Sequence, residues 1–196
     1  MIKRLFDIIF SFFGLLILLP IFIVIAIGIK LESIGGIFYR QTRVGRNNLD
    51  FKIIKFRTMF VNSDAKGLLT LGDHDNRVTK LGYYLRKYKL DELPQLINVL
   101  IGNMSFVGPR PEVRKYVSHY SKEDLEIFKI KPGITDYASI AFRDEAELLK
   151  ATSDPEKLYI EDIMPKKIAL NKKYLNNYSL IADVKIILKT ILTIIK

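Results

Sequence analysis

Cysteine is absent from the 196-residue chain, and histidine is nearly so, with only His74 and His119. Without cysteine there can be no disulfide, no thiolate nucleophile and no cysteine-ligated zinc or iron–sulfur site. Two histidines leave little material for a histidine-rich metal site or a Ser-His-Asp triad. If the chain is an enzyme, we therefore expect it to use carboxylates and metals bound through oxygen.

Positive charge is in excess and is concentrated in one region. The chain has 31 Lys and Arg against 21 Asp and Glu, a formal net charge of +10. Between Tyr39 and Leu90, 12 Lys or Arg accompany 4 Asp, a net charge of +8. This excess predicts partners that carry phosphate: a nucleic acid, a nucleotide or an anionic lipid surface. Nucleic acid is disfavoured, because no recognisable motif for it is present and the basic region adjoins an apolar segment.

That apolar segment covers residues 8–29, which contain no charged side chain. As a continuous helix it would be about 33 Å long, enough to cross a hydrocarbon core of about 30 Å. A cleavable signal peptide is disfavoured, because the run is long and no small-x-small cleavage site follows it. The segment is therefore expected to stay in the protein as a membrane element.

Pro20 lies just past the middle of this run. Proline lacks a backbone donor and clashes with the carbonyl of Leu16, so we expect a kink or a break. A kinked helix could still span a membrane, whereas a broken one would form a re-entrant hairpin with both ends on one face. Lys3 and Arg4 before the run, and the basic stretch from Lys30, each favour the cytoplasm. Only re-entry places both ends there, and it is the preferred prediction.

The rest of the chain reads as short strands and helices without an internal repeat. Two runs rich in β-branched and aromatic residues, 37–44 and 51–59, flank the turn-forming segment 45–48 and predict a β-hairpin. The predicted fold is α+β and mainly helical: a Pro-broken re-entrant anchor over residues 1–34, then one domain over residues 35–196 that carries a small β-hairpin and amphipathic interfacial helices. Other expected elements are a polar loop over 62–76 and helices from near Lys80, from after Asp91 to Gly102, over 114–129, and through most of the C-terminal third.

The C-terminal segment carries an apolar stripe at helical spacing. Charged residues lie mostly on the other side of the helical wheel. The stripe predicts either packing against the protein core or a helix that lies in a membrane interface. Its members are Ile181, Val184, Ile187, Leu188, Ile191, Leu192 and Ile195.

Asp91 and Glu92 are the strongest candidates for chemistry. Pro94 just after them predicts a helix N-terminus, where acidic residues are often no more than caps. Basic residues precede the pair, however, and a Gly-Pro-Arg-Pro turn at 108–111 follows its helix. Two like charges about 4 Å apart repel by about 4 kcal/mol at an effective dielectric constant of 20. A carboxylate that attacks a diphosphate therefore needs guanidinium groups, backbone amides or a metal, for which Mg²⁺ on oxygen ligands is the natural choice.

The segment from Leu90 to Pro111, Leu-Asp-Glu-Leu-Pro-Gln through Gly-Pro-Arg-Pro, resembles the core of the bacterial sugar transferase family, the monotopic phosphoglycosyl transferases. The resemblance extends to Lys-Pro-Gly-Ile-Thr at 131–135, Lys-Phe-Arg-Thr-Met at 55–59 and Lys-Arg-x-x-Asp at 3–7. It covers nearly the whole chain and implies the minimal catalytic module. The sequence departs from many relatives at Leu19, at Asn103 and over residues 136–143, so the identity of the sugar is not carried over.

The resemblance implies transfer of a sugar-1-phosphate from a UDP-sugar to undecaprenyl phosphate, with release of UMP, as the first membrane step of a surface polysaccharide or glycoconjugate pathway. Asp91 would be the nucleophile, forming a phosphosugar-aspartate intermediate, and the protein ligand of Mg²⁺. Glu92 would assist by accepting a proton or by helping to place Mg²⁺. Arg86 and Arg110 would hold phosphates; Arg57 and Arg143 are weaker candidates that would otherwise be surface ion-pair residues.

The same resemblance implies a protein of the inner membrane that faces the cytoplasm, re-entrant through its anchor and in contact with membrane lipid. A homodimer is compatible with the sequence, which does not determine the oligomeric state. The rival hypothesis from another class is a basic, membrane-anchored scaffold or binding protein in which Asp91 and Glu92 are helix caps. Release of UMP from a UDP-sugar discriminates between the two.

Overall fold

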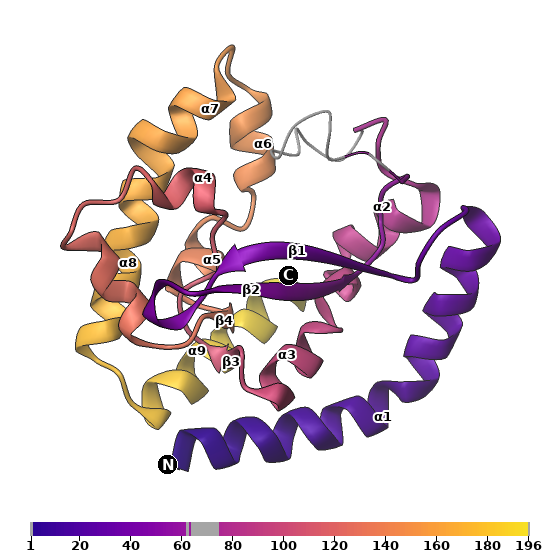
Figure 1. Cartoon of the computed structure of the whole chain (residues 1–196), viewed down its shortest axis with the longest axis horizontal. Helices are drawn as coiled ribbons and strands as arrows, with labels where there is room; N and C mark the ends of the chain where they lie inside the picture. The colour runs from indigo at the N-terminus through magenta and orange to yellow at the C-terminus, as the bar shows by residue number, and fades with distance from the viewer. Residues whose placement is uncertain (1, 62, 64–74, 196) are drawn as a thin grey trace.

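A computed structural model describes residues 2–61, 63 and 75–195 (Figure 1). The fold is α+β and mainly helical, as predicted, with two small two-stranded sheets among the described residues. The strands are β1 (Phe38–Val44), β2 (Asp50–Phe56), β3 (Ser105–Val107) and β4 (Gly133–Thr135). The α-helices are α1 (Ile2–Glu32), α2 (Lys80–Lys87), α3 (Gln95–Ile101), α4 (Arg114–Val117), α5 (Tyr137–Ala141), α6 (Glu145–Lys150), α7 (Pro155–Leu158), α8 (Met164–Asn176) and α9 (Leu180–Ile195). Three further segments are 3-10 helices, η1 (Arg46–Asn48), η3 (Leu90–Glu92) and η4 (Asp124–Lys129), and one is a π-helix, η5 (Tyr159–Ile163).

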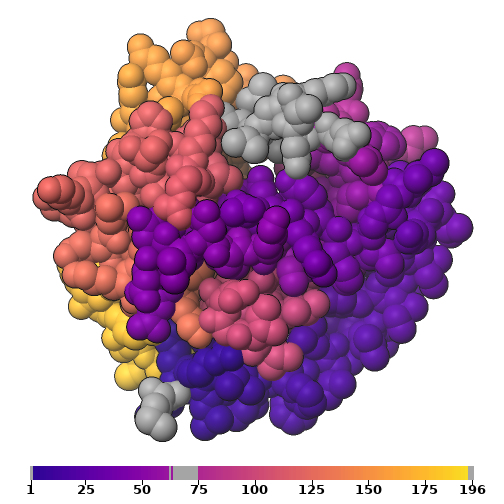
Figure 2. All heavy atoms as spheres, viewed as in Figure 1, coloured from indigo at the N-terminus to yellow at the C-terminus, as the bar shows by residue number. Residues whose placement is uncertain are grey.

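Helix α1 runs along one side of the molecule and bends partway along its length (Figure 1). It continues through Pro20, so the predicted break is not present and the alternative of a kink is what the structure shows. Its most apolar window has a mean hydropathy of 3.0 and is only 11% buried, and its length and composition suffice to cross a membrane. Figure 2 shows α1 along the lower and right edge of the viewed face, with its outer side uncovered.

Polar side chains tie the first turns of α1 to the body of the protein. Asp7, which is buried, accepts hydrogen bonds from Ser105 Oγ at 3.0 Å and Phe106 N at 3.2 Å. Lys3 donates to the carbonyl of Val107 at 3.0 Å and pairs with Asp183 on α9. The charged residues that begin the apolar helix therefore fix it to β3 and to α9.

The end of α1 is tied in the same way. Glu32 accepts a hydrogen bond from Leu81 N at the start of α2, 3.0 Å away. The guanidinium of Arg57 donates to the carbonyls of Ser33, at 2.8 Å, and Ile34. Arg57 also donates to the carbonyl of Ile29, in the last turn of α1, at 3.4 Å. Since the last carbonyls of a helix lack partners within it, this contact caps the C-terminus of α1, and the others hold the end of the helix against its neighbours.

The predicted hairpin is confirmed as β1 and β2, which pair antiparallel from Phe38 opposite Phe56 to Val44 opposite Asp50. Its turn adopts positive φ at Asn47 (57°) and Asn48 (60°), a conformation that asparagine tolerates better than most residues. The second strand ends at Phe56 rather than at residue 59. The predicted polar loop over 62–76 lies mostly outside the described residues.

A parallel pair of strands, β3 and β4, was not predicted. It places the Gly-Pro-Arg-Pro segment, which follows β3, beside residues 131–133. The approach is so close that a Cβ on Gly108 would lie 2.2 Å from the carbonyl oxygen of Lys131. A Cβ on Gly133 would lie 2.1 Å from Gly108 N, so both positions require glycine.

Helix α3 confirms the predicted helix after Asp91, and Gly102 ends it with φ of 97°. The continuous helix expected over 114–129 is wrong: α4 and η4 are separate. Ser121 N donates to the Asp124 carboxylate at 3.1 Å, and Asp124 N donates to Ser121 Oγ at 3.2 Å. These local bonds offer the backbone an alternative to a continuous helix.

Helix α9 turns Asp183 and Ile186 inward, where both are buried, and exposes much of the predicted apolar stripe. Ile181 is 71% exposed and Leu192 is 63% exposed. Of the two interpretations of the stripe, packing of the whole stripe against the core is therefore not supported: Ile187 contacts the core, but the face that turns inward is centred on Asp183 and Ile186. The exposed stripe has the character of an interfacial helix.

Candidate active site

Asp91 and Glu92 lie on η3, between the end of α2 and the start of α3. Thr79 caps α2 by accepting a hydrogen bond from Gly82 N at 2.9 Å. The chain then leaves the helix through Lys89, whose φ is 56°. Pro94 begins the turn that leads into α3. The two carboxylates are thus fixed on a short, well-terminated turn rather than on a flexible loop.

The carboxylate of Asp91 is buried and has no direct partner. The residue is 8% exposed, and within the described part of the chain its carboxylate accepts no hydrogen bond and forms no ion pair. Burial raises its pKa above the ordinary value, and the neighbouring negative charge of Glu92 adds to this, while Lys55 opposes it. When Asp91 is ionised, the positive charges of Lys55, Arg86 and Lys89 therefore offset its charge only in part and without a direct contact.

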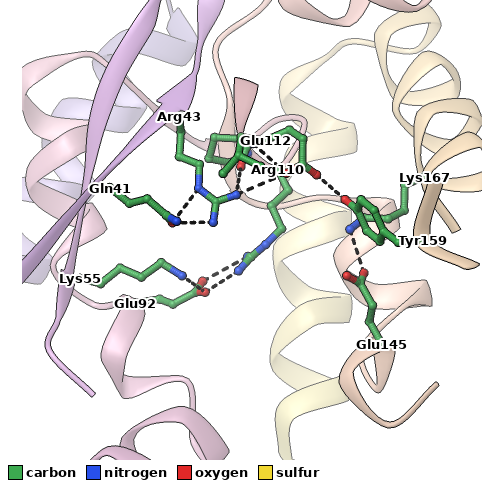
Figure 3. Close-up of polar contacts among 11 residues, drawn as sticks. Gln41, Arg43, Lys55, Glu92, Arg110, Glu112, Glu145, Tyr159 and Lys167 are labelled. Carbon is green, nitrogen blue, oxygen red and sulfur yellow. Dashed lines mark hydrogen bonds and ion pairs between the residues drawn. The ribbon is translucent and has the colours of Figure 1, made fainter. Parts of the chain in front are cut away.

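Glu92 is the opposite case, because two cations occupy its carboxylate (Figure 3). Lys55 on β2 donates to Oε1 at 2.8 Å. Arg110 contacts both oxygens, Oε1 at 2.5 Å and Oε2 at 3.2 Å. Such a two-point arginine–carboxylate contact fixes the orientation of both groups.

These cations determine the ionisation of Glu92. Burial by itself would raise its pKa, but Arg110 and Lys55 outweigh burial and hold the pKa of Glu92 well below its ordinary value. Glu92 in return raises the pKa of Arg110, which stays charged. A carboxylate with so low a pKa is a poor proton acceptor. The low pKa and the two contacts with Arg110 instead suit Glu92 to orienting the guanidinium of Arg110.

A second polar cluster lies next to this one. The guanidinium of Arg43 on β1 donates to Gln41 Oε1 at 2.6 and 2.9 Å and to the carbonyl of Pro111 at 3.2 Å. Tyr159 donates to Glu112 across the same loop (Figure 3). Burial lowers the pKa of Arg43, an effect that Glu112 opposes. Residues 110–112 are thus held between the hairpin and the C-terminal helices.

The structure brings four of the six predicted site residues together, through direct contact or through electrostatic interaction: Asp91, Glu92, Arg86 and Arg110. Arg110 contacts Glu92, and Arg86 lowers the pKa of Asp91 electrostatically. Arg57 is buried against the end of α1, and its guanidinium is occupied by carbonyls there. Arg143 is exposed, near α9, where it donates to the carbonyl of Thr193. The substrate-binding roles of Arg57 and Arg143 stay predictions.

Sequence reasoning missed Lys55, Arg43, Glu112, Tyr159 and Asp136. Only the hairpin residues carried a usable signal. Because alternate residues of a strand share a face, Gln41 and Arg43 lie on one face of β1, and the register adds Lys55 to it from β2. The other three join the site only through long-range packing.

The donor set can be compared with what Mg²⁺ requires. Among the described residues, no three Asp, Glu or His side chains cluster as a ready-made metal site. Mg²⁺ is commonly bound through one or two carboxylates, with water and substrate phosphates as its other ligands. The unpartnered carboxylate of Asp91 fits that pattern, whereas the oxygens of Glu92 are already committed to cations.

Comparison with known proteins identifies the family of the chain. The family model for the bacterial sugar transferase matches residues 1–196, and the chain belongs to that family. Over 99% of its length the chain is 38% identical to a UDP-N-acetylgalactosamine-undecaprenyl-phosphate N-acetylgalactosaminephosphotransferase of Aeromonas hydrophila. Over 97% of its length it is 37% identical to a UDP-glucose:undecaprenyl-phosphate glucose-1-phosphate transferase of Escherichia coli K12. These matches cover only 44% and 39% of those two proteins. The exopolysaccharide production protein ExoY of Rhizobium meliloti is 35% identical over 97% of this chain and is matched over 84% of its own length.

Proposed function

We propose that this protein transfers a sugar-1-phosphate from a UDP-sugar to undecaprenyl phosphate and releases UMP. The observation that carries the proposal is the state of Asp91: a buried residue whose carboxylate has no direct partner among the described residues, with the positive charges of Lys55, Arg86 and Lys89 nearby. The names of two relatives supply the substrate class, a UDP-sugar and undecaprenyl phosphate. The name of a third, ExoY, supports a place in the synthesis of a surface polysaccharide or glycoconjugate, as its first membrane step.

The chemistry follows from the charges at the site. An oxygen of Asp91 attacks the phosphorus that bears the sugar, the bond from that phosphorus to the UMP oxygen breaks, and UMP leaves. The product is a phosphosugar-aspartate, a mixed anhydride. An oxygen of undecaprenyl phosphate then attacks the same phosphorus, which frees Asp91 and yields a diphosphate-linked sugar. This is covalent catalysis in two steps, with ping-pong kinetics as its signature.

The cations have separate tasks in this scheme. Arg110 is proposed to contact a phosphate of the donor while Glu92, which also pairs with Lys55, holds it in place. Arg86 is proposed to offset the charge that accumulates as Asp91 approaches the diphosphate. When Mg²⁺ is bound, through Asp91 and substrate phosphates, it neutralises phosphate charge and polarises the bond to the leaving UMP.

The exposed apolar surfaces support a place on the membrane. The uncovered side of α1 and the exposed stripe of α9 would face lipid, with Lys185 and Lys189 beside the stripe at headgroup level. Undecaprenyl phosphate presents its phosphate at that level and UDP-sugars are cytoplasmic, so the site is proposed to face the cytoplasm. A re-entrant α1 that turns at its bend, without a break, would keep both of its ends on that face, with residues 1–34 as the anchor and 35–196 as the catalytic domain.

The test of the function is an assay of the full chain with a panel of UDP-sugars that includes UDP-glucose and UDP-N-acetylgalactosamine, with Mg²⁺ and undecaprenyl phosphate. One donor is expected to give UMP, and labelled donor without lipid is expected to leave label on the peptide that contains Asp91. Label on another side chain would overturn the covalent mechanism. UMP from none of the panel would favour the basic membrane-anchored scaffold instead.

The topology has a separate test, which the absence of cysteine makes simple. Single cysteines are placed at Ile2 and Ile34, both exposed at the two ends of α1. In vesicles of known orientation, a membrane-impermeant maleimide should label both positions from the cytoplasmic side. Labelling from opposite sides would show that α1 spans the membrane.

A further inference from the structure

The backbone around Arg110 is held by a hydrogen bond at nearly every residue. Gly108 N donates to the carbonyl of Thr135 at 3.1 Å, and Gly133 N donates to the carbonyl of Pro109 at 3.0 Å. On the other side, Arg43 donates to the carbonyl of Pro111 at 3.2 Å. The segment therefore belongs to the rigid frame formed by β3, β4 and the hairpin.

Among the residues that the structure describes, Asp136 is the acceptor for the peptide N–H of Arg110 itself. Its Oδ2 accepts that N–H at 2.9 Å, while its Oδ1 accepts Ser139 N at 2.5 Å and thereby caps α5. The residue is 0% exposed, so neither bond competes with bulk water. A buried carboxylate has a cost that is offset only by its partners, and here each oxygen has one.

We propose that Asp136 is a positioning residue, which fixes the backbone of Arg110 so that its guanidinium meets both Glu92 and a phosphate of the donor. Arg110 is then held at two points: Glu92 contacts its guanidinium, and Asp136 accepts a hydrogen bond from its backbone N–H. Two prolines flank Arg110, so its N–H is the only peptide donor between residues 109 and 111. Without Asp136 this donor has no acceptor among the described residues. The inference rests on the proposed function, because it takes Arg110 as a phosphate-binding residue.

The chain offers a matched control for a helix cap. Asp154 caps α7 by accepting Lys157 N at 3.0 Å, is exposed, and holds no part of the site. Serine caps helices nearly as well as aspartate, but its single oxygen cannot serve two separate donors. Asp136→Ser and Asp154→Ser therefore both keep a cap, and only the first removes the acceptor of Arg110 N–H.

Two measurements on the full chain test the proposal. Hydrogen exchange of a peptide over residues 108–112 should be faster in Asp136→Ser than in the wild type and unchanged in Asp154→Ser. With the panel donor that turns over best, Asp136→Ser should lower kcat/KM for UMP release by about 10- to 100-fold, mainly through KM, because small misplacements of a binding group have effects of this size. In an Arg110→Ala background the same change should cost less than about twofold, since the residue through which Asp136 acts is gone.

Three outcomes would overturn the proposal. One is a kcat/KM for Asp136→Ser equal to that of Asp154→Ser, another is an equal further loss in the Arg110→Ala background, and the third is unchanged exchange over 108–112. If Asp136→Ser does not fold, Asp136→Thr replaces it, since threonine also caps helices and also has a single side-chain oxygen, and the same outcomes apply. An absence of UMP from the wild type would instead sink the proposed function, and hydrogen exchange would still decide whether Asp136 holds Arg110.

Discussion

Asp91 and Glu92 are adjacent in the chain, yet the two sides of the site that they face use charge in opposite ways. On the side of Glu92, Lys55 and Arg110 compensate the carboxylate and lower its pKa. On the side of Asp91 the carboxylate is equally enclosed, but no cation contacts it within the described chain, and its pKa is raised. A fully paired group stabilises the fold and orients its neighbours, whereas a buried group without a partner is available to a ligand or a reaction.

The largest effect expected from this comparison is on catalysis. Asp91→Asn should lower UMP release by about a thousandfold or more, because a neutral amide replaces the nucleophilic carboxylate. Glu92→Gln should lower it by about 10- to 100-fold, because Arg110 loses its charged partner while the nucleophile remains. Steady-state UMP release measures both, with Glu126→Gln, an exposed carboxylate paired to Lys129, as the control. Equal losses for Asp91→Asn and Glu92→Gln would contradict the division of roles.

Stability should respond in opposite directions to the same two substitutions. At neutral pH, without Mg²⁺ or substrate, Glu92→Gln should destabilise the fold by about 2 kcal/mol, or about 4–8 °C in Tm, since it weakens charged hydrogen bonds. Asp91→Asn should raise Tm, because it removes a negative charge that burial and Glu92 disfavour more than the nearby cations offset. Thermal unfolding in detergent measures both. A lower Tm for Asp91→Asn would show that a compensating partner exists.

The pH dependence of these differences also has opposite signs. The folded pKa of Glu92 is lowered, so its stabilising contribution is present above the ordinary value of 4.5 and is lost as pH falls from there toward the folded value. The folded pKa of Asp91 is raised, so its unfavourable contribution is present above the folded value and vanishes as pH falls toward 3.8. The Tm advantage of Asp91→Asn should therefore shrink on acidification through that window. An advantage that is independent of pH would have another cause than charge.

The elements and the main residues that enter this comparison could be predicted from the sequence, although their contacts could not. The spacing of apolar residues predicts α1, α3 and the hairpin, because each rests on a local period or a turn. Asp91, Glu92 and Arg110 stand in motifs with their own local signals, a proline at a helix start and a Gly-Pro-Arg-Pro turn. Residues in such local patterns can be found from sequence alone.

The parts that the sequence did not reveal depend on distant contacts. Strands β3 and β4 are three residues each, too short for a period to register, and only their pairing brings Asp136 to Arg110. The use of the C-terminal stripe was undecided for the same reason. A helical wheel shows that α9 has an apolar face, but which face packs inward is set by the contact of Asp183 with Lys3, 180 residues away.

The smallest expected effects extend the comparison of paired and unpaired groups to Arg57 and Arg143. Arg57 is buried and donates to carbonyls at the end of α1, so Arg57→Met should cost about 1.5–2 kcal/mol and change kcat/KM little. The guanidinium of Arg143 is exposed, so Arg143→Met should change stability by less than about 0.5 kcal/mol. Thermal unfolding and UMP release, measured on the same preparations, separate a loss of stability from a loss of substrate binding. A large rise in KM for Arg143→Met at unchanged Tm would instead support Arg143 as a substrate-binding residue. A surface group that contributes little to the fold can affect KM only by contacting the substrate or by changing the electrostatic potential at the site.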